Sequence, residues 1–173
     1  MATVPLRVEF DALFCSKKFR TLQTVVCAVS VLEGANRGLS IEAREGFDYI
    51  DAPDIARWKE ISAAVKELAA GQHPTVAVWA QVAPAYVNHI RPRVTAEILK
   101  VSVETLRRTG KDEADILVGC HGPLSELACL DMNSMRALRE ADIVCYEVHI
   151  HDIVLLDDPG AEIISSTFIH RGF

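Results

Sequence analysis

The sequence predicts a single mixed α/β or α+β domain, in which helices pack on a sheet of parallel and antiparallel strands and a β-hairpin follows near the C-terminus. Two unbroken apolar runs, at residues 75–82 and 116–118, are typical of strands that are covered on both faces. Amphipathic stretches with helical spacing separate the apolar runs along the chain. Near the C-terminus, Pro159-Gly160 is placed as in a tight turn between two apolar segments.

The composition is that of a globular protein. The chain has 173 residues, of which 50% are hydrophobic and 24% charged, and its net charge is −6. These values predict one domain over residues 1–173. No run approaches the roughly 18 apolar residues of a membrane span, and the N-terminus lacks the pattern of a secretory signal, so we expect a cytoplasmic protein. The acidic balance and the lack of a basic run argue against nucleic acid and membranes as partners.

The five cysteines are scattered along the chain and form no CxxC pair. This spacing predicts reduced thiols, and it argues against both a disulfide framework and a cysteine-rich zinc site.

The N-terminal part predicts a strand and then a helix. Leu6, Val8 and Phe10 alternate with charged residues, which indicates a strand over residues 4–14. A helix is expected over residues 17–33, because one apolar stripe recurs at helical spacing and Ser16 can cap it. The stripe consists of Phe19, Leu22, Val26 and Val29. Several β-branched valines in this segment leave a strand as the alternative.

Residues 38–51 predict two short strands around Glu45-Gly46, a hairpin candidate because glycine tolerates tight turns. A second helix is expected over residues 54–70. Its apolar stripe contains Ile55, Trp58, Ile61, Val65 and Leu68.

The middle of the chain predicts a βαβ unit. It consists of a strand over residues 75–82, a helix over residues 95–109 that Gly110 ends, and a strand over residues 114–119. Such a unit makes the two strands parallel and close neighbours. Residues 83–93 are then a loop at the carboxyl end of the first strand. The C-terminal strands, expected over residues 143–156 and 161–170, form an antiparallel hairpin around the turn at residues 157–160.

The first candidate site is Cys120-His121, where a buried strand ends and Gly122-Pro123 begins a predicted helix. The helix N-terminus can bind an anion and can lower the pKa of a neighbouring thiol. We therefore consider Cys120 and His121 as catalytic residues and the Gly122 backbone as a contact to substrate. The alternative is that Cys120 is a small buried side chain and that His121 completes the turn.

The second candidate site is the loop at residues 83–93. It contains Asn88, His89, Arg91 and Arg93, and the two guanidinium groups match the geometry of a carboxylate or phosphate. Ligands bind beyond the carboxyl ends of parallel strands, so this loop and Cys120-His121 are expected to share a crevice. The alternative is a solvated loop whose arginines pair with surplus acidic residues.

The third candidate site is on the C-terminal hairpin. Glu147, His149 and His151 alternate along a strand and share one face, with Glu147 as a further candidate acid or base. A hairpin loop of two or four residues brings His170 to the same face, opposite His149 or Glu147. Three imidazoles can bind zinc or another divalent metal and activate a water molecule. A metal-free acid/base role and a structural role are the alternatives.

Together these sites predict a small-molecule metabolic enzyme. The expected chemistry is acid/base or metal-assisted hydrolysis, elimination or isomerisation of a metabolite that carries a carboxylate or phosphate. The alternative is a non-catalytic, oligomeric ligand-binding or assembly protein, because the apolar segment 153–156 requires a cover. In both cases we expect a homo-oligomer. The chain contains no GxGxxG, GxxxxGK[ST] or HExxH motif.

Overall fold

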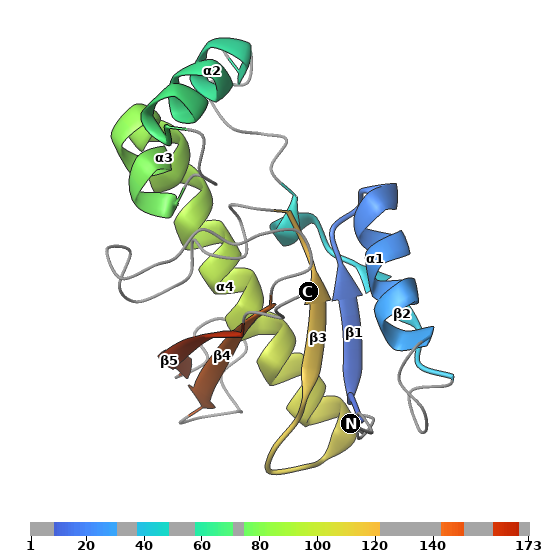
Figure 1. Ribbon diagram of the computed structural model, residues 1–173. Coiled ribbons are helices and arrows are strands. Elements are labelled where there is room, and N and C mark those ends of the chain that lie inside the picture. The colour runs from blue at the N-terminus through green and yellow to red at the C-terminus, as the bar shows by residue number, and fades with distance from the viewer. Residues whose placement is uncertain are drawn as a thin grey trace, which may run out of the picture.

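The computed structural model describes residues 9–30, 38–48, 58–70, 75–121, 143–150 and 161–169, and it has an α/β fold (Figure 1). Three strands form a parallel sheet in the order β2-β1-β3, and they are β1 (Ala12–Cys15), β2 (Ile41–Ala43) and β3 (Ile116–Gly119). The predicted fold class is confirmed. Among the described strands, the antiparallel pair forms a second sheet, separate from the parallel one.

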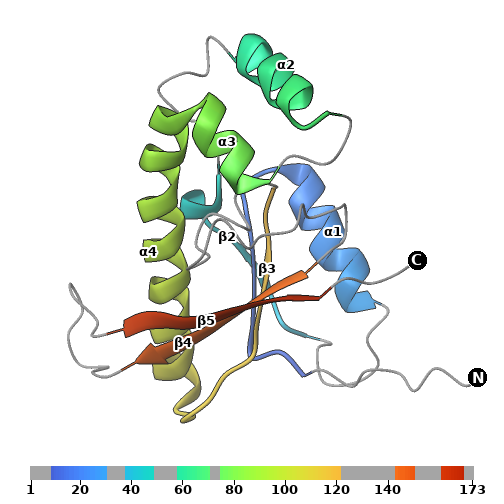
Figure 2. The same cartoon turned by 60° about the vertical axis from the view of Figure 1, so that its left-hand side comes forward.

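The parallel sheet lies between two helices, α1 (Phe19–Ser30) and α4 (Pro84–Thr109), as Figures 1 and 2 show from two directions. All four residues of β1 are buried. Ala12 and Phe14 pack in a cluster with Val101 of α4, whereas Leu13 and Cys15 pack on the other side, with α1. Alternate residues of a strand face opposite sides of a sheet, so the unbroken apolar sequence of β1 reflects its two covers.

Helix α1 confirms the helix predicted over residues 17–33, of which residues 31–33 lie outside the described ranges. The predicted apolar stripe is wrong for three of its four residues, because only Val29 is half-buried and packs beside Val25. Thr21 and Val25 are the buried residues, whereas Phe19 and Val26 are 70% and 49% exposed. The helix is rotated by about one residue from the expected position, because close contact with β3 favours small and β-branched side chains.

The first strand is shorter than expected. Residues 9 and 10 precede β1, which begins at Ala12, and residues 4–8 lie outside the described ranges. The hairpin predicted in residues 38–51 is wrong, because β2 pairs in parallel with β1 and continues into a 3-10 turn, η1 (Glu45–Phe47). Gly46 is required there for close packing, since a Cβ atom on it would lie 2.4 Å from Glu97 Oε2 of α4.

The strand predicted over residues 75–82 is wrong, because this segment forms helix α3 (Val76–Val82). Thr75 caps the helix, its side chain accepting a hydrogen bond from Val78 N at 3.4 Å. The predicted βαβ unit is therefore wrong as well. The buried residues show why, since they recur at intervals of three or four across α3 and α4: Val76, Trp79, Ala83, Tyr86, Val87, Ile90 and Val94.

Helix α4 contains 26 residues and includes most of the predicted loop at residues 83–93. Pro84 occupies its start, where a missing N–H has no consequence. Pro92 lies inside the helix, and Ile90 and Val94 on either side of it are buried in the core. The predicted stop is confirmed, because Gly110 has φ 66° and donates its N–H to Leu106 O.

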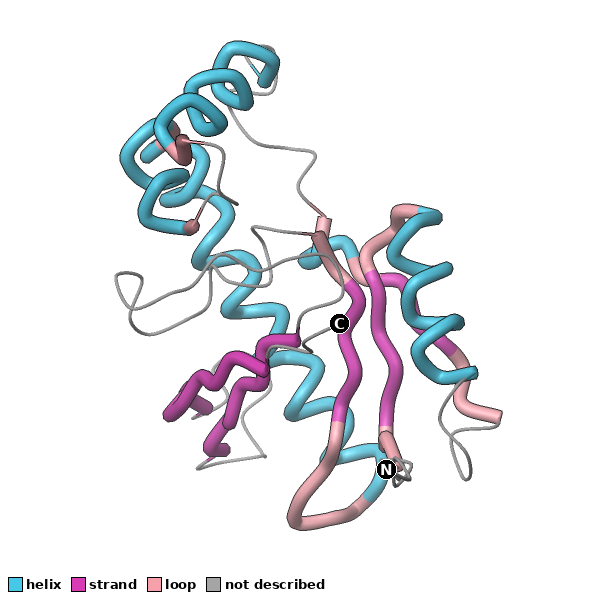
Figure 3. The backbone as a smooth tube through the Cα atoms, viewed as in Figure 1, coloured by secondary structure: helices cyan, strands magenta, loops and turns pink. Residues whose placement is uncertain are grey.

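Helix α2 (Trp58–Leu68) confirms the helix predicted over residues 54–70, apart from residues 54–57, which lie outside the described ranges. Ile61 and Val65 are buried in one cluster with residues of α3 and α4. In Figures 1 and 2, α2 and α3 lie beyond the carboxyl ends of β1 and β3. Figure 3 shows the long α4 reaching from this edge to the opposite one.

The C-terminal hairpin is confirmed, with β4 (Ile143–Ile150) and β5 (Ala161–Ile169) antiparallel. Ile150 pairs with Ala161, so the register differs from the expected one, in which a four-residue turn would pair residue 156 with Ala161; residues 151–160 lie outside the described ranges. The register shifts after Glu147, where β5 has a bulge. Val148 and Ile163 pack on the cluster that contains α3 and α4.

Candidate functional site

The carboxyl ends of β1 and β3 bring Ser16 and His121 together. Cys15 pairs with Gly119 in the sheet, and the Ser16 N–H donates to Gly119 O at 2.9 Å, which extends the pairing by one residue. Cys120 and His121 follow β3 directly. His121 Nε2 lies 3.3 Å from Ser16 Oγ, although 105 residues separate the two in the sequence.

Two buried hydroxyl groups support His121. Ser16 Oγ lies 2.8 Å from Thr21 Oγ1 on α1, and both residues are buried. The Thr21 hydroxyl is 2.7 Å from Lys18 O and donates to it. Ser16 Oγ also accepts from Lys18 N at 3.3 Å. The turn between β1 and α1 is therefore ordered by side-chain hydrogen bonds, as expected for serine and threonine before a helix.

Gly119 allows α1 to approach β3 closely enough for these contacts. A Cβ atom at Gly119 would lie 2.4 Å from Val25 Cγ2 and 3.1 Å from Thr21 O. Any side chain at this position would push the first turns of α1 away from β3. Because Thr21 and Ser16 belong to that region, the absence of a side chain at Gly119 determines the geometry of the His121 contact.

Arg20 lies on the other side of the imidazole. Its Nη2 is 3.5 Å from His121 Nδ1, and Arg20 itself is exposed. A guanidinium group only donates hydrogen bonds, so Nδ1 must be the acceptor and Nε2 must carry the proton in the neutral ring. His121 then donates from Nε2 to Ser16 Oγ, and the Ser16 hydroxyl donates to Thr21.

The surroundings of His121 favour the neutral ring. Burial is the largest cause that lowers the pKa of His121 below its ordinary value of 6.5, and the charges of Arg20 and Lys18 lower it further. The charge of Asp48 acts in the opposite direction. These surroundings therefore favour the uncharged ring, the state in which an imidazole can accept a proton.

Asp48 and Glu45, from the segment after β2, hold the same turn from its other side. Asp48 is buried, and its Oδ1 accepts from Lys17 N at 2.9 Å. Glu45 forms an ion pair with Lys17 at 2.8 Å, which is the main cause of the lowered pKa of Glu45. The charge of Arg93 lowers this pKa slightly as well, so Arg93 of α4 lies on the side of η1.

Ser16 is unsuited to act as a nucleophile. Only 1% of its surface is exposed, and its hydroxyl oxygen already contacts Thr21, His121 and the Lys18 N–H. The ring nitrogen that faces the exposed side chain of Arg20 is Nδ1. The accessible chemistry of the site therefore consists of a cationic donor and an imidazole nitrogen that can exchange a proton.

Cys120 lies between two parts of the core. Like Ile98 of α4, it packs against the cluster of α3 and α4 and also against the cluster of β1 and η1. This position favours the structural alternative for the thiol, whereas its catalytic role stays a prediction. Gly122 lies outside the described residues. Cys15 is buried, which raises the pKa of its thiol and makes it a poor nucleophile.

The predicted anion-binding loop does not exist, because its residues belong to α4. Asn88 and His89 are exposed on the helix, and Arg91 and Arg93 are half-buried. Residues two apart on a helix do not face each other, so Arg91 and Arg93 do not form a single clamp. Residues 83–93 and Cys120-His121 were expected to share a crevice. This holds in part, because Cys120 packs against the core cluster that also contains residues of this part of α4.

The hairpin confirms the predicted alternation on β4, because Glu147 and His149 are exposed while Val148 and Ile150 are half-buried. The predicted partners are wrong. His149 pairs with Glu162 and Glu147 pairs with Ser165.

The far end of the hairpin explains the difference. Ile169, the residue before His170, pairs with Ile143, which is six residues from His149 and therefore about 20 Å away along the strand. His151 and His170 lie outside the described residues. Within the described ranges, no group of three or more His, Cys, Asp or Glu side chains is arranged to hold a metal ion. The zinc site stays a prediction.

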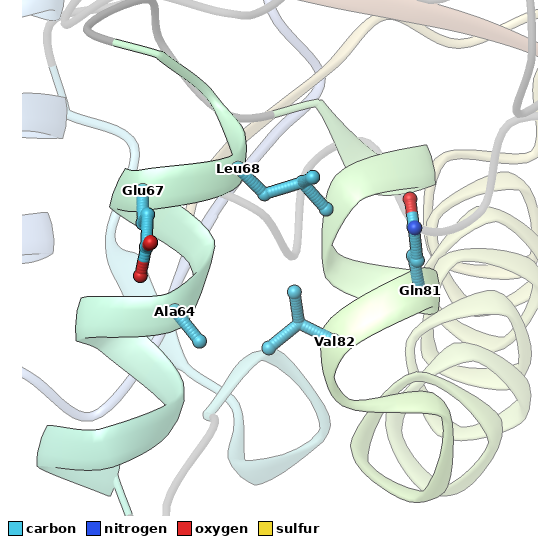
Figure 4. A pocket seen from close by; sticks show the side chains of 5 residues that line it. All are labelled: Ala64, Glu67, Leu68, Gln81 and Val82. Atoms are coloured by element: carbon cyan, nitrogen blue, oxygen red, sulfur yellow. The ribbon is translucent and has the colours of Figure 1, made fainter.

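An open groove of about 540 Å³ lies between α2 and α3 (Figure 4). Ala64 and Leu68 of α2 face Val82 of α3 across it, and Glu67 and Gln81 stand at its sides. The groove contains none of the residues around His121. Its polar side chains do not converge on a common point, so it does not resemble a catalytic site.

Sequence reasoning found His121 but missed Ser16, Arg20 and Thr21. The available signal was the rule already applied to Cys120-His121, because Ser16 also follows a continuous apolar run, 12–15. That run was interpreted as the end of a longer, half-exposed strand. For this reason the end of this run was not identified from the sequence as the carboxyl end of a buried parallel strand, where a ligand site is expected.

Comparisons with protein-family models, with curated proteins and with solved structures found no match for the chain. Among the described helices, none has the length and apolar character needed to cross a membrane. The functional argument therefore depends on the geometry around His121.

Proposed function

We propose that the protein is a small-molecule enzyme that binds an anionic metabolite beyond the carboxyl ends of β1 and β3 and exchanges a proton with it through His121. The reaction class is a hydrolysis, an elimination or an isomerisation. A single observation supports the proposal most strongly: a neutral imidazole stands between an exposed guanidinium and two buried hydroxyl groups.

The arrangement fits ligand binding better than structural support. A buried or half-buried histidine that only stabilises a fold is well served by a carboxylate or a carbonyl partner. Here the donor beside Nδ1 is Arg20, whose charge disfavours the protonated ring. An arginine at the start of a helix is, in contrast, well suited to a carboxylate or phosphate, because the N-terminal N–H groups add positive potential.

Anion binding can be tested by thermal unfolding with sulfate and with malonate at constant ionic strength. A ligand at 100 times its dissociation constant stabilises the folded state by about 2.7 kcal/mol. We expect both anions to raise the melting temperature of the wild type and to have little effect on Arg20→Ala. Arg108→Ala is the matched control, because Arg108 is an exposed arginine at the opposite edge of the sheet, where it donates to Asp11 O. Equal responses of the two variants would contradict the proposal.

The alternative function, an oligomeric assembly protein, is favoured by a different observation. Phe19, Leu22 and Val26 form an exposed apolar stripe on α1. The solution mass of the wild type and of Val26→Lys, taken together with the response to anions, distinguishes the two functions. A wild-type oligomer that Val26→Lys dissociates, combined with no response to anions, would support the alternative.

A further inference from the structure

We propose that Arg20 is a positioning residue, which holds His121 as a neutral ring in the free protein and transfers its hydrogen bond from Nδ1 to the anion when an anion binds. The inference rests on the proposed function, and it adds how binding and proton transfer are coupled. The motivating observation is the contact between a permanently charged donor and an uncharged acceptor, Arg20 Nη2 to His121 Nδ1 at 3.5 Å.

In the free protein the direction of each hydrogen bond follows from Arg20. Because the guanidinium can only donate, Nδ1 accepts and Nε2 carries the ring proton. The proton on Nε2 points to Ser16 Oγ at 3.3 Å, and the Ser16 hydroxyl then donates to Thr21 Oγ1 at 2.8 Å. Thr21 donates in turn to Lys18 O. A protonated His121 would direct a second N–H at the guanidinium, so the chain of bonds favours the neutral ring.

Anion binding reverses this preference. A carboxylate or sulfate oxygen is a stronger partner for Arg20 than a neutral nitrogen, because the bond between two charged groups is about twice as strong. Nδ1 then loses its donor and lies near a negative charge. It can accept a proton from the ligand or from water, and the ring becomes a cation that keeps Nε2–H on Ser16. The other charged groups around the ring are Asp48, whose charge raises the pKa of His121, and Lys18, whose charge lowers it.

The test is an NMR titration of the His121 ring, with His121→Gln to assign its signal. Sulfate is the probe, because it stays a dianion throughout the titration of a histidine, and ionic strength is kept constant. In the wild type, saturating sulfate should move the titration midpoint of His121 to higher pH. In Arg20→Gln, the midpoint should already be higher without sulfate, and sulfate should not move it further.

Lys18→Gln is the matched control, because it removes a neighbouring cation that lowers the pKa of His121 less than Arg20 does. Its midpoint should rise less than that of Arg20→Gln and should still respond to sulfate. Equal rises in the two variants would overturn the positioning role, since any lost charge would then suffice. Thermal stabilisation by sulfate without a change in the midpoint would overturn the coupling and leave the proposed function intact. No thermal stabilisation at all would overturn the proposed function and the release step, while the two variants would still decide the positioning role.

Discussion

Strands β1 and β3 are parallel, so their amino ends lie together at one edge of the sheet and their carboxyl ends lie together at the opposite edge. The side chains around the amino edge and around the carboxyl edge interact in different ways. At the amino edge, Asp11 accepts from Asp115 N at 3.1 Å and forms an ion pair with Lys111 at 2.5 Å. At the carboxyl edge, Arg20 lies beside the residues that follow β3, and its Nη2 is 3.5 Å from Nδ1 of the neutral His121 ring.

The difference indicates which edge is structural. At the amino edge, opposite charges neutralise each other, which lowers the pKa of Asp11 and raises that of Lys111. At the carboxyl edge, hydroxyl groups and a neutral imidazole are ordered beside the charges of Arg20 and Lys18, with the carboxylate of Asp48 also close, and it is to this edge that the proposed function assigns anion binding.

The largest effect is expected from Gly119→Ala. The new methyl group would meet Val25 Cγ2 and the Thr21 carbonyl, so α1 must move. We expect a loss at the upper end of about 1–3 kcal/mol in the free energy of unfolding, measured with urea. Gly119→Ala combined with Val25→Ala should cost less than the sum of the two single changes, because the smaller side chain relieves the contact. Wild-type stability of Gly119→Ala would show that α1 does not need this close approach.

An intermediate effect is expected from Thr21→Val, which removes a buried hydroxyl and keeps the branched shape. Because the Ser16 hydroxyl then has no Thr21 oxygen to donate to, we expect the free energy of unfolding to fall by about 1–2 kcal/mol. The His121 titration should also change, since Ser16 is its partner on Nε2. The control is Thr24→Val on the same helix. Thr24 is exposed and its hydroxyl donates to Arg20 O, so we expect its replacement to change the free energy of unfolding by no more than about 0.5 kcal/mol. Similar losses at both positions would argue against a special role of the buried pair.

The smallest effect is expected at the amino edge, from Lys111→Gln. The ion pair with Asp11 is exposed, and such pairs contribute little. Its contribution depends on pH with a defined sign. The pKa of Asp11 is lowered from 3.8, so the stability it adds is present above pH 3.8 and is lost as the pH falls through the lower, folded-state value. Urea unfolding should therefore show a small difference from the wild type at pH 7 that disappears in acid.

Lys100→Gln, at an exposed lysine of α4, is the control. Neither lysine variant should alter the response to sulfate, and a loss of that response in Lys111→Gln would remove the contrast between the edges.

Features that depend on residues close together in the chain could be predicted from the sequence. Gly110 ends α4 because glycine adopts the left-handed conformation easily, and residues 116–119 form a half-buried strand because their apolar run is bounded by breaking residues. The apolar stripe that includes Ile61 and Val65 was enough to identify α2. The position of His121 at a strand end followed from the same local reasoning.

Features that depend on residues far apart in the chain could not be predicted, because they follow from how the elements pack together. Residues 75–82 contain a short apolar run that is compatible with a strand or a helix, and packing of Val76 and Trp79 on α4 selected the helix. The register of the hairpin, in which Ile150 pairs with Ala161, set the partner of His149, and the bulge on β5 shifted the partner of Glu147 by one further residue. The contact between Ser16 and His121 joins residues on two strands that are neighbours in the sheet but far apart in the chain. Periodicity describes which face of an element is buried, whereas strand order, helix rotation and register determine which side chains meet.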